Sequence, residues 1–253
     1  MKHKPFCIVK DLHISFHGRT VLQKINLTLN DSKIIVLVGP SGSGKTTFLR
    51  SLNRLNEYYP GYSGRGEIEL DLSGSMQSIH HPQVNVTELR RQVGMVFQTP
   101  NVLPVSIAKN INLPLNLVTD LDKVGREKRL VEALQEVHLW DEVKDRLKEN
   151  ASRLSGGQQQ RLCLARVLAL KPKILLLDEP TASLDFKASR RIENLLIELQ
   201  DRYQIIAVSH SLRQARKIAG QIVVMAEGQI AHLLEKEQFE SPDMLQKLLE
   251  EIF

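Results

Sequence analysis

Apolar residues in this chain fall into two patterns that alternate along its length. Continuous apolar runs at Ile34–Val38, Ile174–Leu177 and Ile205–Val208 are typical of parallel strands that are buried on both faces. Between these runs, apolar residues recur at helical spacing, as from Thr46 to Asn56 and from Phe186 to Tyr203. The alternation predicts an α/β fold with a mostly parallel sheet and helices on both of its faces.

Shorter apolar runs predict the remaining elements. We expect strands at Cys7–Val9, Ile25–Leu29, Glu67–Leu70, Val93–Phe97, Ile222–Met225 and Gln229–His232. The first two are joined by a turn at Gly18-Arg19. We also expect a short helix at Thr87–Gln92, capped by Thr87, and another helix at Ser211–Ala219.

A long helical segment separates two of the core strands. Helical spacing runs through Ser106–Asn150, with an interruption expected at Pro114. Ser155 then caps a further helix that extends to about Leu170. We interpret residues 106–170, approximately, as a helical subdomain inserted into the α/β core.

The chain has 253 residues, near the upper limit for one hydrophobic core, and no Pro-, Gly- or Ser-rich linker divides it. We expect one domain over residues 1–253, ending in a helical tail at about 237–253. No apolar run approaches the roughly 18–20 residues that span a bilayer, and no apolar stretch follows the basic N-terminus as in a signal peptide. Cys7 and Cys163 form no metal-binding or disulfide pattern, which suits a reducing cytoplasm.

The formal net charge of +5 is mildly basic. Such a charge can favour nucleic acid or an anionic membrane surface. However, charged runs such as Arg126–Arg129 mix both signs, as an exposed helix face does. We therefore expect no nucleic-acid partner.

A glycine-rich segment matches the phosphate-binding loop G-x-x-x-x-G-K-[ST]. It follows a predicted strand and precedes a predicted helix, which is the context that this motif requires. Backbone N–H groups and the helix dipole are expected to hold the phosphates of ATP, while Lys45 reaches the β- and γ-phosphates, Thr46 holds Mg²⁺ and Thr47 lies near the α-phosphate. The predicted ATP-binding residues of this loop are Gly39, Pro40, Ser41, Gly42, Ser43, Gly44, Lys45, Thr46 and Thr47.

Two carboxylates, Asp178 and Glu179, end the apolar strand Ile174–Leu177. Ligands of open α/β sheets bind at the C-terminal ends of the strands. We expect Asp178 to bind Mg²⁺, directly or through water, and Glu179 to act as general base or to orient the attacking water. Because the metal needs only one acid, the second acid predicts hydrolysis rather than binding alone.

Residues Leu154–Gln158 read Leu-Ser-Gly-Gly-Gln and lie between the phosphate loop and the acidic strand. With these three motifs in this order, the chain resembles the ATP-binding cassette family, the ATPases of ABC transporters, from about Val9 to Ala226. The resemblance implies a P-loop NTPase core with a mostly parallel sheet, an antiparallel N-terminal β subdomain and the inserted helical subdomain. It also implies that ATP and Mg²⁺ are the cofactors.

The resemblance assigns roles to three further positions. Gln98 corresponds to a glutamine that touches Mg²⁺ and the attacking water, and so joins the predicted metal ligands. His210 resembles the family's switch histidine, which contacts the γ-phosphate and supports the water. Phe16 stands where the family stacks an aromatic ring on adenine.

By the same resemblance, two cassettes form a homodimer head to tail, with two ATP molecules in the seam. The signature residues Ser155, Gly156, Gly157 and Gln158 would bind the ATP of the partner, through N–H groups at a helix start. The segment Ser183-Leu184-Asp185 resembles the loop that links the two sites, with Ser183 and Asp185 at the dimer.

The resemblance also implies membrane partners. The loop Thr99–Ser106 would face two integral-membrane permease subunits, which carry the cargo. An extracytoplasmic solute-binding protein would be an indirect partner. The chain would lie at the cytoplasmic face of the cell membrane as a peripheral subunit.

Three stretches bear on the cargo. Leu52–Glu57, Val86–Ile107 and Ser155–Cys163 resemble the ATPase subunit of bacterial phosphate importers. The chain departs from that subfamily in a short helical insert, in Ser209-His210-Ser211 where Thr-His-Asn is usual, and in its C-terminal ending. Polar amino-acid importers share much of the same sequence and are the main alternative to phosphate import.

Two hypotheses from different functional classes are less well supported by the sequence. A cassette ATPase that acts in DNA repair or translation would be expected to carry a long coiled-coil insert or a second cassette, and we find neither pattern. A nucleotide-binding regulatory module without turnover would be expected to lack Glu179 or His210, and both are present. We therefore expect the ATP-hydrolysing subunit of an importer, most similar to those for inorganic phosphate.

Overall fold

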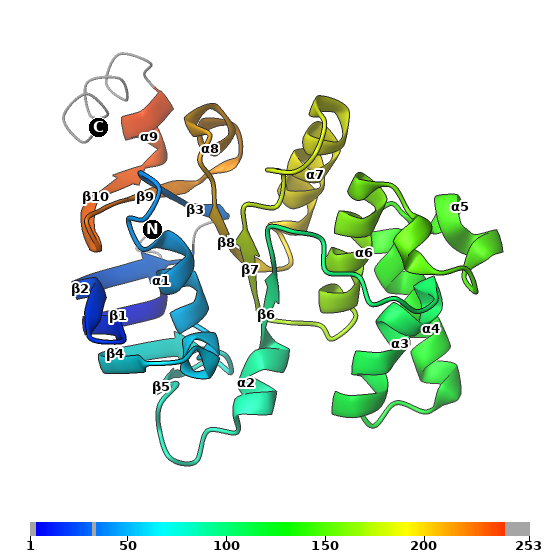
Figure 1. The fold of residues 1–253 in the computed structure, drawn as a ribbon, viewed down its shortest axis with the longest axis horizontal. Coiled ribbons are helices and arrows are strands. Elements are labelled where there is room, and N and C mark those ends of the chain that lie inside the picture. The colour runs from blue at the N-terminus through cyan, green and yellow to red at the C-terminus, as the bar shows by residue number, and fades with distance from the viewer. Residues whose placement is uncertain (1–3, 32–33, 241–253) are drawn as a thin grey trace.

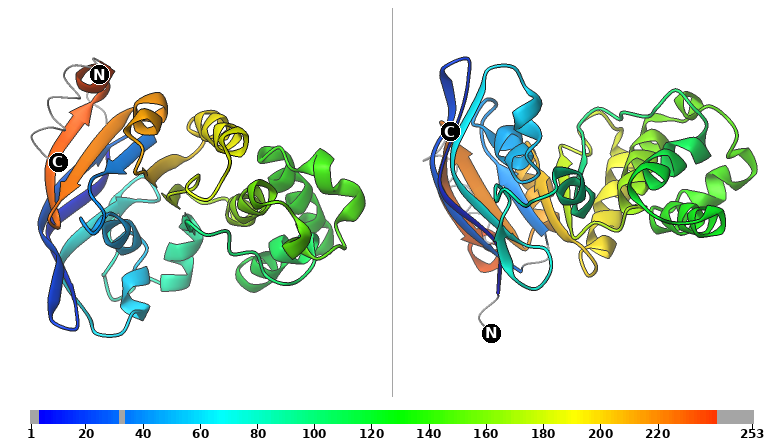
Figure 2. Two further views of the ribbon diagram at one scale, coloured as in Figure 1. Left: turned by 45° about the horizontal axis from the view of Figure 1, so that its top comes forward. Right: turned by 90° about the horizontal axis from the view of Figure 1, so that it is seen from below.

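The structure is a computed structural model that describes residues 4–31 and 34–240. Two β-sheets lie at one end of the molecule, and a group of helices from the middle of the chain lies at the other (Figure 1). Both views in Figure 2 keep this division, so it is not an effect of one projection. Residues 241–253, most of the predicted helical tail, lie outside the described part of the chain.

Among the described residues, the larger sheet has six strands in the order β10-β9-β3-β8-β7-β6. They are β3 (Ile34–Val38), β6 (Val93–Val96), β7 (Ile174–Asp178), β8 (Gln204–Val208), β9 (Gln221–Ala226) and β10 (Gln229–Glu235). Neighbouring strands from β6 to β9 pair in parallel, and β10 pairs antiparallel with β9. The prediction of a mostly parallel sheet is confirmed.

The smaller sheet is antiparallel and, in the part of the chain that the structure describes, has four strands in the order β2-β1-β4-β5. They are β1 (Pro5–Phe16), β2 (Arg19–Asn30), β4 (Tyr62–Asp71) and β5 (Met76–Ser78). The predicted runs at Cys7–Val9, Ile25–Leu29 and Glu67–Leu70 are only parts of these strands. Because β1 pairs on both sides, backbone hydrogen bonds extend it through polar residues that carry no apolar signal.

Helices outside the insert are short except for one. They are α1 (Lys45–Ser51), α2 (Val86–Gln92), α7 (Phe186–Leu199), α8 (Leu212–Ile218) and α9 (Lys236–Glu240), with a 3₁₀ turn at Leu55–Tyr58. The inserted helices are α3 (Ile107–Val118), α4 (Lys123–Glu136), α5 (Trp140–Val143) and α6 (Gly156–Leu168), with 3₁₀ turns at Lys144–Arg146 and Ala151–Arg153.

Alternate residues of the larger sheet face two different cores. In β3, Ile34 and Val36 join a cluster with residues of α6, α7 and α8, whereas Ile35 and Leu37 join one with α1 and the smaller sheet. Helices on both faces were expected from the sequence. The structure adds that the smaller sheet covers much of the second face.

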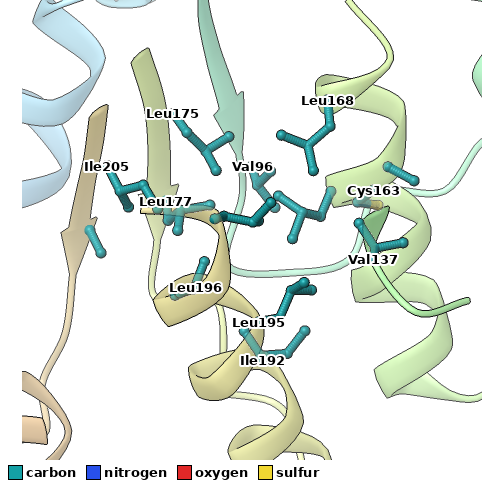
Figure 3. Packing of buried hydrophobic residues seen from close by; sticks show 14 of the residues in the cluster. Val96, Val137, Cys163, Leu168, Leu175, Leu177, Ile192, Leu195, Leu196 and Ile205 are labelled. Atoms are coloured by element: carbon teal, nitrogen blue, oxygen red, sulfur yellow. The ribbon is translucent and has the colours of Figure 1, made fainter. Parts of the chain in front are cut away.

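The first cluster is continuous from the larger sheet into the helical insert. Figure 3 shows Val96 and Leu175 of the sheet close to Leu168 and Cys163 of α6. Cys163 is 5% exposed, as expected of a small core residue. This shared core fixes α6, and therefore the signature at its start, relative to the sheet.

Three sequence predictions about helices are wrong. Thr87 does not cap α2, because Asn85 Oδ1 accepts hydrogen bonds from the N–H groups of Thr87 at 2.9 Å and Glu88 at 3.2 Å. Asparagine is the better cap, and the helix begins one residue earlier than expected.

Pro114 does not interrupt the helix but lies inside α3. A proline inside a helix costs about 3 kcal/mol, because it removes one backbone hydrogen bond and its ring clashes with the preceding turn. This cost is offset by burial, because Ile107, Ile111 and Leu115 are fully buried in the shared core. Burial of each side chain stabilises the fold by about 1.5–3 kcal/mol. Packing therefore outweighs the proline.

The helix predicted from Thr46 to Asn56 ends at Ser51. The carbonyl of Thr47 accepts hydrogen bonds from Ser51 Oγ and Asn56 Nδ2, both at 2.8 Å. Arg54 then adopts a left-handed backbone conformation with φ of 58°, which reverses the chain into the 3₁₀ turn.

Candidate functional site

The candidate site lies where four parallel strands end side by side. The phosphate loop follows β3, Gln98 follows β6, Asp178 ends β7, and His210 comes shortly after β8. Val208 at the end of β8 stands opposite Asp178 on one side and Leu37 on the other. Sequence segments far apart in the chain therefore meet at one edge of the sheet, as expected for an open α/β sheet.

The phosphate loop needs glycine at two positions. Gly39 has φ of 148°, and a Cβ there would lie 2.0 Å from the carbonyl oxygen of Met225. Gly44 has φ of 97°, and a Cβ there would lie 2.5 Å from Leu22 Cδ2. Gly44 is also the N-cap of α1 and offers no side-chain acceptor, so the first N–H groups of that helix receive no side-chain cap.

Lys45 is folded back onto the loop that carries it. Its Nζ donates to the carbonyl oxygens of Gly39 and Pro40, each at 2.8 Å, and the residue is 5% exposed. Burial lowers the pKa of Lys45, and the charges of Glu179 and Asp178 oppose this shift. The ammonium group is thus held at the loop, within the field of both acids.

Asp178 is almost enclosed, and its partners are cationic or hydroxylic. Thr46 Oγ1 donates to Asp178 Oδ1 at 2.8 Å, and Arg50 Nη2 lies 3.8 Å from Asp178 Oδ2. Hydroxyl and carboxylate oxygens are ligands that magnesium accepts together with substrate phosphates. Thr46 and Asp178 therefore fit the predicted Mg²⁺ role, with Gln98 nearby as a further oxygen donor. Sequence reasoning missed Arg50.

Glu179 is held by two neighbours, one on each carboxylate oxygen. Gln98 Nε2 donates to Glu179 Oε2 at 3.1 Å, and His210 Nε2 forms a close ion-pair contact with Glu179 Oε1. The backbone of Glu179, directly after β7, is left-handed with φ of 48°, a conformation that is uncommon for a residue other than glycine. The three predicted catalytic residues thus form one contact group.

Side-chain hydrogen bonds hold the loop that contains His210, although its sequence Ser-His-Ser is unusual. Buried Ser209 Oγ donates to Gln214 Oε1 at 2.7 Å and accepts from the N–H of Ser211 at 3.0 Å. Ser211 caps α8, and Gln214 Nε2 donates to Thr181 Oγ1 at 2.8 Å. The Ser-His-Ser departure therefore still gives an ordered support for His210.

A cavity of about 300 Å³ opens in front of these groups. Its described lining residues are Val21, Ser41, Gly42, Gly44, Lys45, Thr46, Thr47, Glu179 and His210. Phe16 is not among them; its ring centroid lies 6.3 Å from that of Tyr59 and 6.0 Å from that of Tyr62. Gly39, Pro40 and Ser43 also lie outside the described lining, inside the loop.

The signature residues lie in a different place, at the start of α6. Ser155 caps this helix in a capping box: Gln158 N donates to Ser155 Oγ at 3.4 Å, and Ser155 N donates to Gln158 Oε1 at 3.0 Å. They line a second cavity of about 380 Å³ together with Ser183, Leu184 and Asp185. Asp185 caps α7 by accepting from Ala188 N at 2.9 Å.

The described linings of the two cavities share no residue. The structure therefore joins the signature to the 183–185 loop but not to the phosphate loop of the same chain. Sequence reasoning missed Glu142, Lys187 and Arg191, which line the signature cavity and belong to no motif. It gave no separate role to Arg161, which also lines the cavity and lies in the stretch Ser155–Cys163.

A third cavity, of about 330 Å³, lies at the loop after Gln98. Phe97, Gln98, Thr99, Pro100 and Asn101 line it together with Arg50 and Asp178. The segment predicted to face membrane subunits therefore borders the same aspartate that faces Thr46.

The two cysteines take no part in these cavities among the residues described. Both are buried and free. Burial raises the pKa of Cys7 to about 12 and also raises that of Cys163. Within residues 4–31 and 34–240, no helix is both long and apolar enough to cross a bilayer.

Comparison with protein families gives one clear match. The family model described as ABC transporter matches residues 22–182, which is more than half of the chain. This span includes the phosphate loop, Gln98, the signature, and the acids Asp178 and Glu179 at the end of β7.

Curated relatives match over most of the chain. The phosphate import ATP-binding protein PstB 2 of Bacillus licheniformis is 43% identical over 222 residues, covering 88% of this chain and 79% of that protein. The phosphate import ATP-binding protein PstB of Thermotoga maritima is 40% identical over 227 residues, covering 90% of this chain and 89% of that protein.

Solved structures share the fold. The ATP-binding cassette MJ0796, in a dimeric post-hydrolysis state bound to ADP and Pi, is 29% identical with a TM-score of 0.75, over 91% of this chain and 98% of that one. CbiO1 of Clostridium perfringens, part of an ABC transporter complex, is 24% identical with a TM-score of 0.78, over 98% of this chain and 95% of that one. The latter likeness concerns the fold alone.

Proposed function

The chain belongs to the ABC transporter family of ATP-binding cassettes, and on that basis we propose that it is the ATPase subunit of an importer of inorganic phosphate. Phosphate is proposed as the transported solute because the chain is similar to phosphate import ATP-binding proteins. The identities are 43% and 40%, over 88% and 90% of the chain. The edge of the larger sheet supports the ATPase chemistry.

ATP binds at the phosphate loop. Lys45 turns from its loop carbonyls to the β- and γ-phosphates, and the uncapped start of α1 receives the phosphates with its N–H groups. Thr46, Asp178 and Gln98 hold Mg²⁺, which when bound offsets the negative charge of the phosphates. Phe16 stacks on adenine after leaving its contacts with Tyr59 and Tyr62.

Glu179 acts on the water that attacks the γ-phosphate. Its carboxylate accepts the proton of that water or orients it, Gln98 positions the same water, and His210 contacts the γ-phosphate. The contacts of Glu179 with Gln98 and His210 support this assignment because they gather the three side chains at one point of the cavity.

The chain forms a head-to-tail homodimer. Ser155, Gly156, Gly157 and Gln158 of each copy close over the ATP of the other copy, and the Ser183–Asp185 loop links the two sites. Support comes from the separation of the two cavities within one chain. The dimeric state of the similar cassette MJ0796 supports the formation of a dimer.

The dimer drives two integral-membrane permease subunits from the cytoplasmic face of the membrane. ATP closes the dimer, the membrane subunits move with it, and hydrolysis reopens it. The loop Thr99–Ser106 docks to these subunits, and the cavity at Gln98 supports that role because it joins the loop to Asp178. A solute-binding protein outside the cell delivers phosphate to the permease.

Cargo is tested outside this chain, because none of its described residues is assigned to touch the transported phosphate. Deletion of the gene is expected to abolish uptake of labelled phosphate at low external concentration. Complementation with wild type should restore uptake, and complementation with Lys45→Ala should not. Unchanged phosphate uptake with lost uptake of a polar amino acid would transfer the assignment to that class of importer.

A further inference from the structure

Glu142, on the short helix α5, lies directly behind the signature. Its carboxylate accepts hydrogen bonds from two residues of α6: Gln158 Nε2 at 2.8 Å and Arg161 Nη2 at 3.1 Å, both at Oε2. Arg161 Nη1 forms an ion pair with the other oxygen, Oε1, at 2.9 Å. Arg161 is 5% exposed, so this carboxylate is the charge partner of a buried guanidinium.

This contact determines which way the amide of Gln158 points. An ionised carboxylate can only accept hydrogen bonds, so Glu142 must face the NH₂ group of Gln158. The amide oxygen of Gln158 then faces Ser155 and accepts its backbone N–H at 3.0 Å. A flipped amide would set oxygen against carboxylate and NH₂ against N–H, and both hydrogen bonds would be lost.

The orientation of Gln158 in turn determines what Ser155 can offer to a ligand. Because the N–H of Ser155 is already bonded, its hydroxyl and the N–H groups of Gly156 and Gly157 remain as polar groups at the start of α6. N–H groups in the first turn have no intrahelical acceptor. Glu142 therefore acts on the cavity through Gln158, without itself belonging to the signature.

Glu142 also connects three elements around the cavity. Arg191 Nη1 on α7 lies 4.0 Å from Glu142 Oε1, and α7 begins at the cap Asp185. The charged side chains of the described lining are three basic ones, Arg161, Lys187 and Arg191, and two acidic ones, Glu142 and Asp185. The carboxylate of Glu142 thus joins α5, α6 and α7 at the cavity that they share.

We propose that Glu142 is a positioning residue for the signature, which orients Gln158 and thereby prepares Ser155 to receive the ATP of the partner subunit. The proposal rests on the proposed head-to-tail dimer. Its consequence is specific: loss of Glu142 weakens closure over ATP without weakening binding of ATP at the chain's own phosphate loop.

The test uses the isosteric change Glu142→Gln in a Glu179→Gln background, where turnover does not interfere. Arg161 contacts both carboxylate oxygens, so we expect the single amide oxygen of the variant to lie between Nη1 and Nη2 of this buried guanidinium, with the introduced NH₂ facing Gln158. The amide of Gln158 then flips away from its bond with Ser155. We expect the ATP concentration at half-maximal dimerisation to rise about tenfold, as for loss of one charge-assisted hydrogen bond. ATP affinity of the monomer and the melting temperature should change little.

A second substitution distinguishes orientation from general support. Gln158→Glu, added to Glu142→Gln, restores an acceptor toward Ser155 and an acceptor toward the introduced amide, and dimerisation should recover by several-fold. Asp141→Asn is the matched control, because Asp141 is the neighbouring residue on α5 and pairs only with exposed Lys144 in the contacts described. It should behave as the parent.

Two results overturn the proposal: equal dimerisation of Glu142→Gln and Asp141→Asn, or a loss in Glu142→Gln that Gln158→Glu does not reduce. A Ser155→Arg variant measured in parallel separates this failure from failure of the dimer model. If Ser155→Arg dimerises normally, the head-to-tail dimer itself is wrong. If Ser155→Arg alone is impaired, only the role of Glu142 is wrong.

Discussion

The phosphate-loop cavity and the signature cavity each lie at the start of a helix, and only one of these helices has a side-chain cap. Helix α1 begins after Gly44, which is left-handed and offers no side-chain acceptor, whereas α6 begins after Ser155, which closes a complete capping box. A helix start without a side-chain cap leaves backbone N–H groups that can bind an anion. A capped start is stable without one, so the signature keeps its shape before a partner arrives.

The two regions also differ in the charges of the side chains that surround them. Two acids, Asp178 and Glu179, stand at the phosphate-loop edge, where Thr46, Gln98 and His210 contact them. The lining of the signature cavity has more basic than acidic side chains, and Glu142 contacts two of the basic ones. The first region thus has the groups for hydrolysis, and the second has the groups for closing over phosphates that are already bound.

The largest effect predicted by this difference is on turnover at the acidic edge. Glu179→Gln keeps the shape of the side chain but cannot accept a proton, and steady-state hydrolysis should fall by roughly 10²–10⁴-fold while ATP binding persists. Rates are measured by release of inorganic phosphate. Glu198→Gln is the control, because Glu198 also faces a histidine, His138 at 2.7 Å, but lies outside both cavities. Hydrolysis near wild type in Glu179→Gln would refute the role of Glu179.

The next effect separates the two helix starts. Lys45→Ala removes a charge-assisted hydrogen bond to the phosphates and should weaken ATP binding by the monomer about 10–100-fold. Ser155→Arg should leave that binding intact and yet block hydrolysis, because its side chain fills the signature cavity. Equilibrium binding of a fluorescent ATP analogue, measured at low protein concentration, distinguishes them. Equal losses of ATP binding by the two monomeric variants would place both residues in one site and contradict the division into two sites.

A mixture of these two variants sharpens the result. A mixed dimer contains one seam site with both residues intact and one with neither. If each seam site works alone, random pairing should restore about a quarter of wild-type hydrolysis, since half of the dimers are mixed. Either variant alone, at the same total concentration, is the control and should remain inactive.

The smallest predicted effect concerns pH and the support behind the signature. Burial raises the pKa of Glu142, but hydrogen bonds from Arg161 and Gln158 outweigh burial and hold the pKa below its usual value of 4.5. The stabilisation is therefore fully present above pH 4.5 and is lost as pH falls through the pKa of the folded state. Because the side chain is 36% exposed, the contribution should stay under about 1 kcal/mol.

Thermal unfolding checks this effect. Glu142→Gln should melt slightly below wild type at pH 7, and the difference should shrink as the pH falls below 4.5. Asp141→Asn serves as the control at each pH because Asp141 is exposed on the same helix. A constant difference at every pH would mean that the carboxylate charge of Glu142 does not stabilise the fold.

Prediction from the sequence succeeded where a motif joins a buried strand to a helix. The runs at Ile34–Val38 and Ile205–Val208 were recognisable because both faces are buried, which leaves no polar residue in them. The residues that follow such strands must meet at one edge, so the sequence alone was enough to group Asp178, Glu179 and His210.

Prediction failed where long-range packing or side-chain caps decide the outcome. The length of β1 depends on pairing partners on both sides. Helix α3 continues through Pro114 because it packs into a core whose other residues are distant in the sequence. Glu142 and Arg50 belong to no motif and reach their cavities only through the tertiary fold. The contact of Phe16 with Tyr59 could not be read from the local pattern either, while its stacking on adenine stays a prediction.

The central claim is that the two helix starts complete one site only when two chains meet. Sedimentation of Glu179→Gln, with and without Mg-ATP, tests it most directly. The account predicts a mass near that of the 28.7 kDa chain without nucleotide, about twice that mass with Mg-ATP, and no increase when Ser155→Arg is added although ATP still binds. A monomer at saturating Mg-ATP, or a Ser155→Arg variant that dimerises as well as its parent, would contradict it.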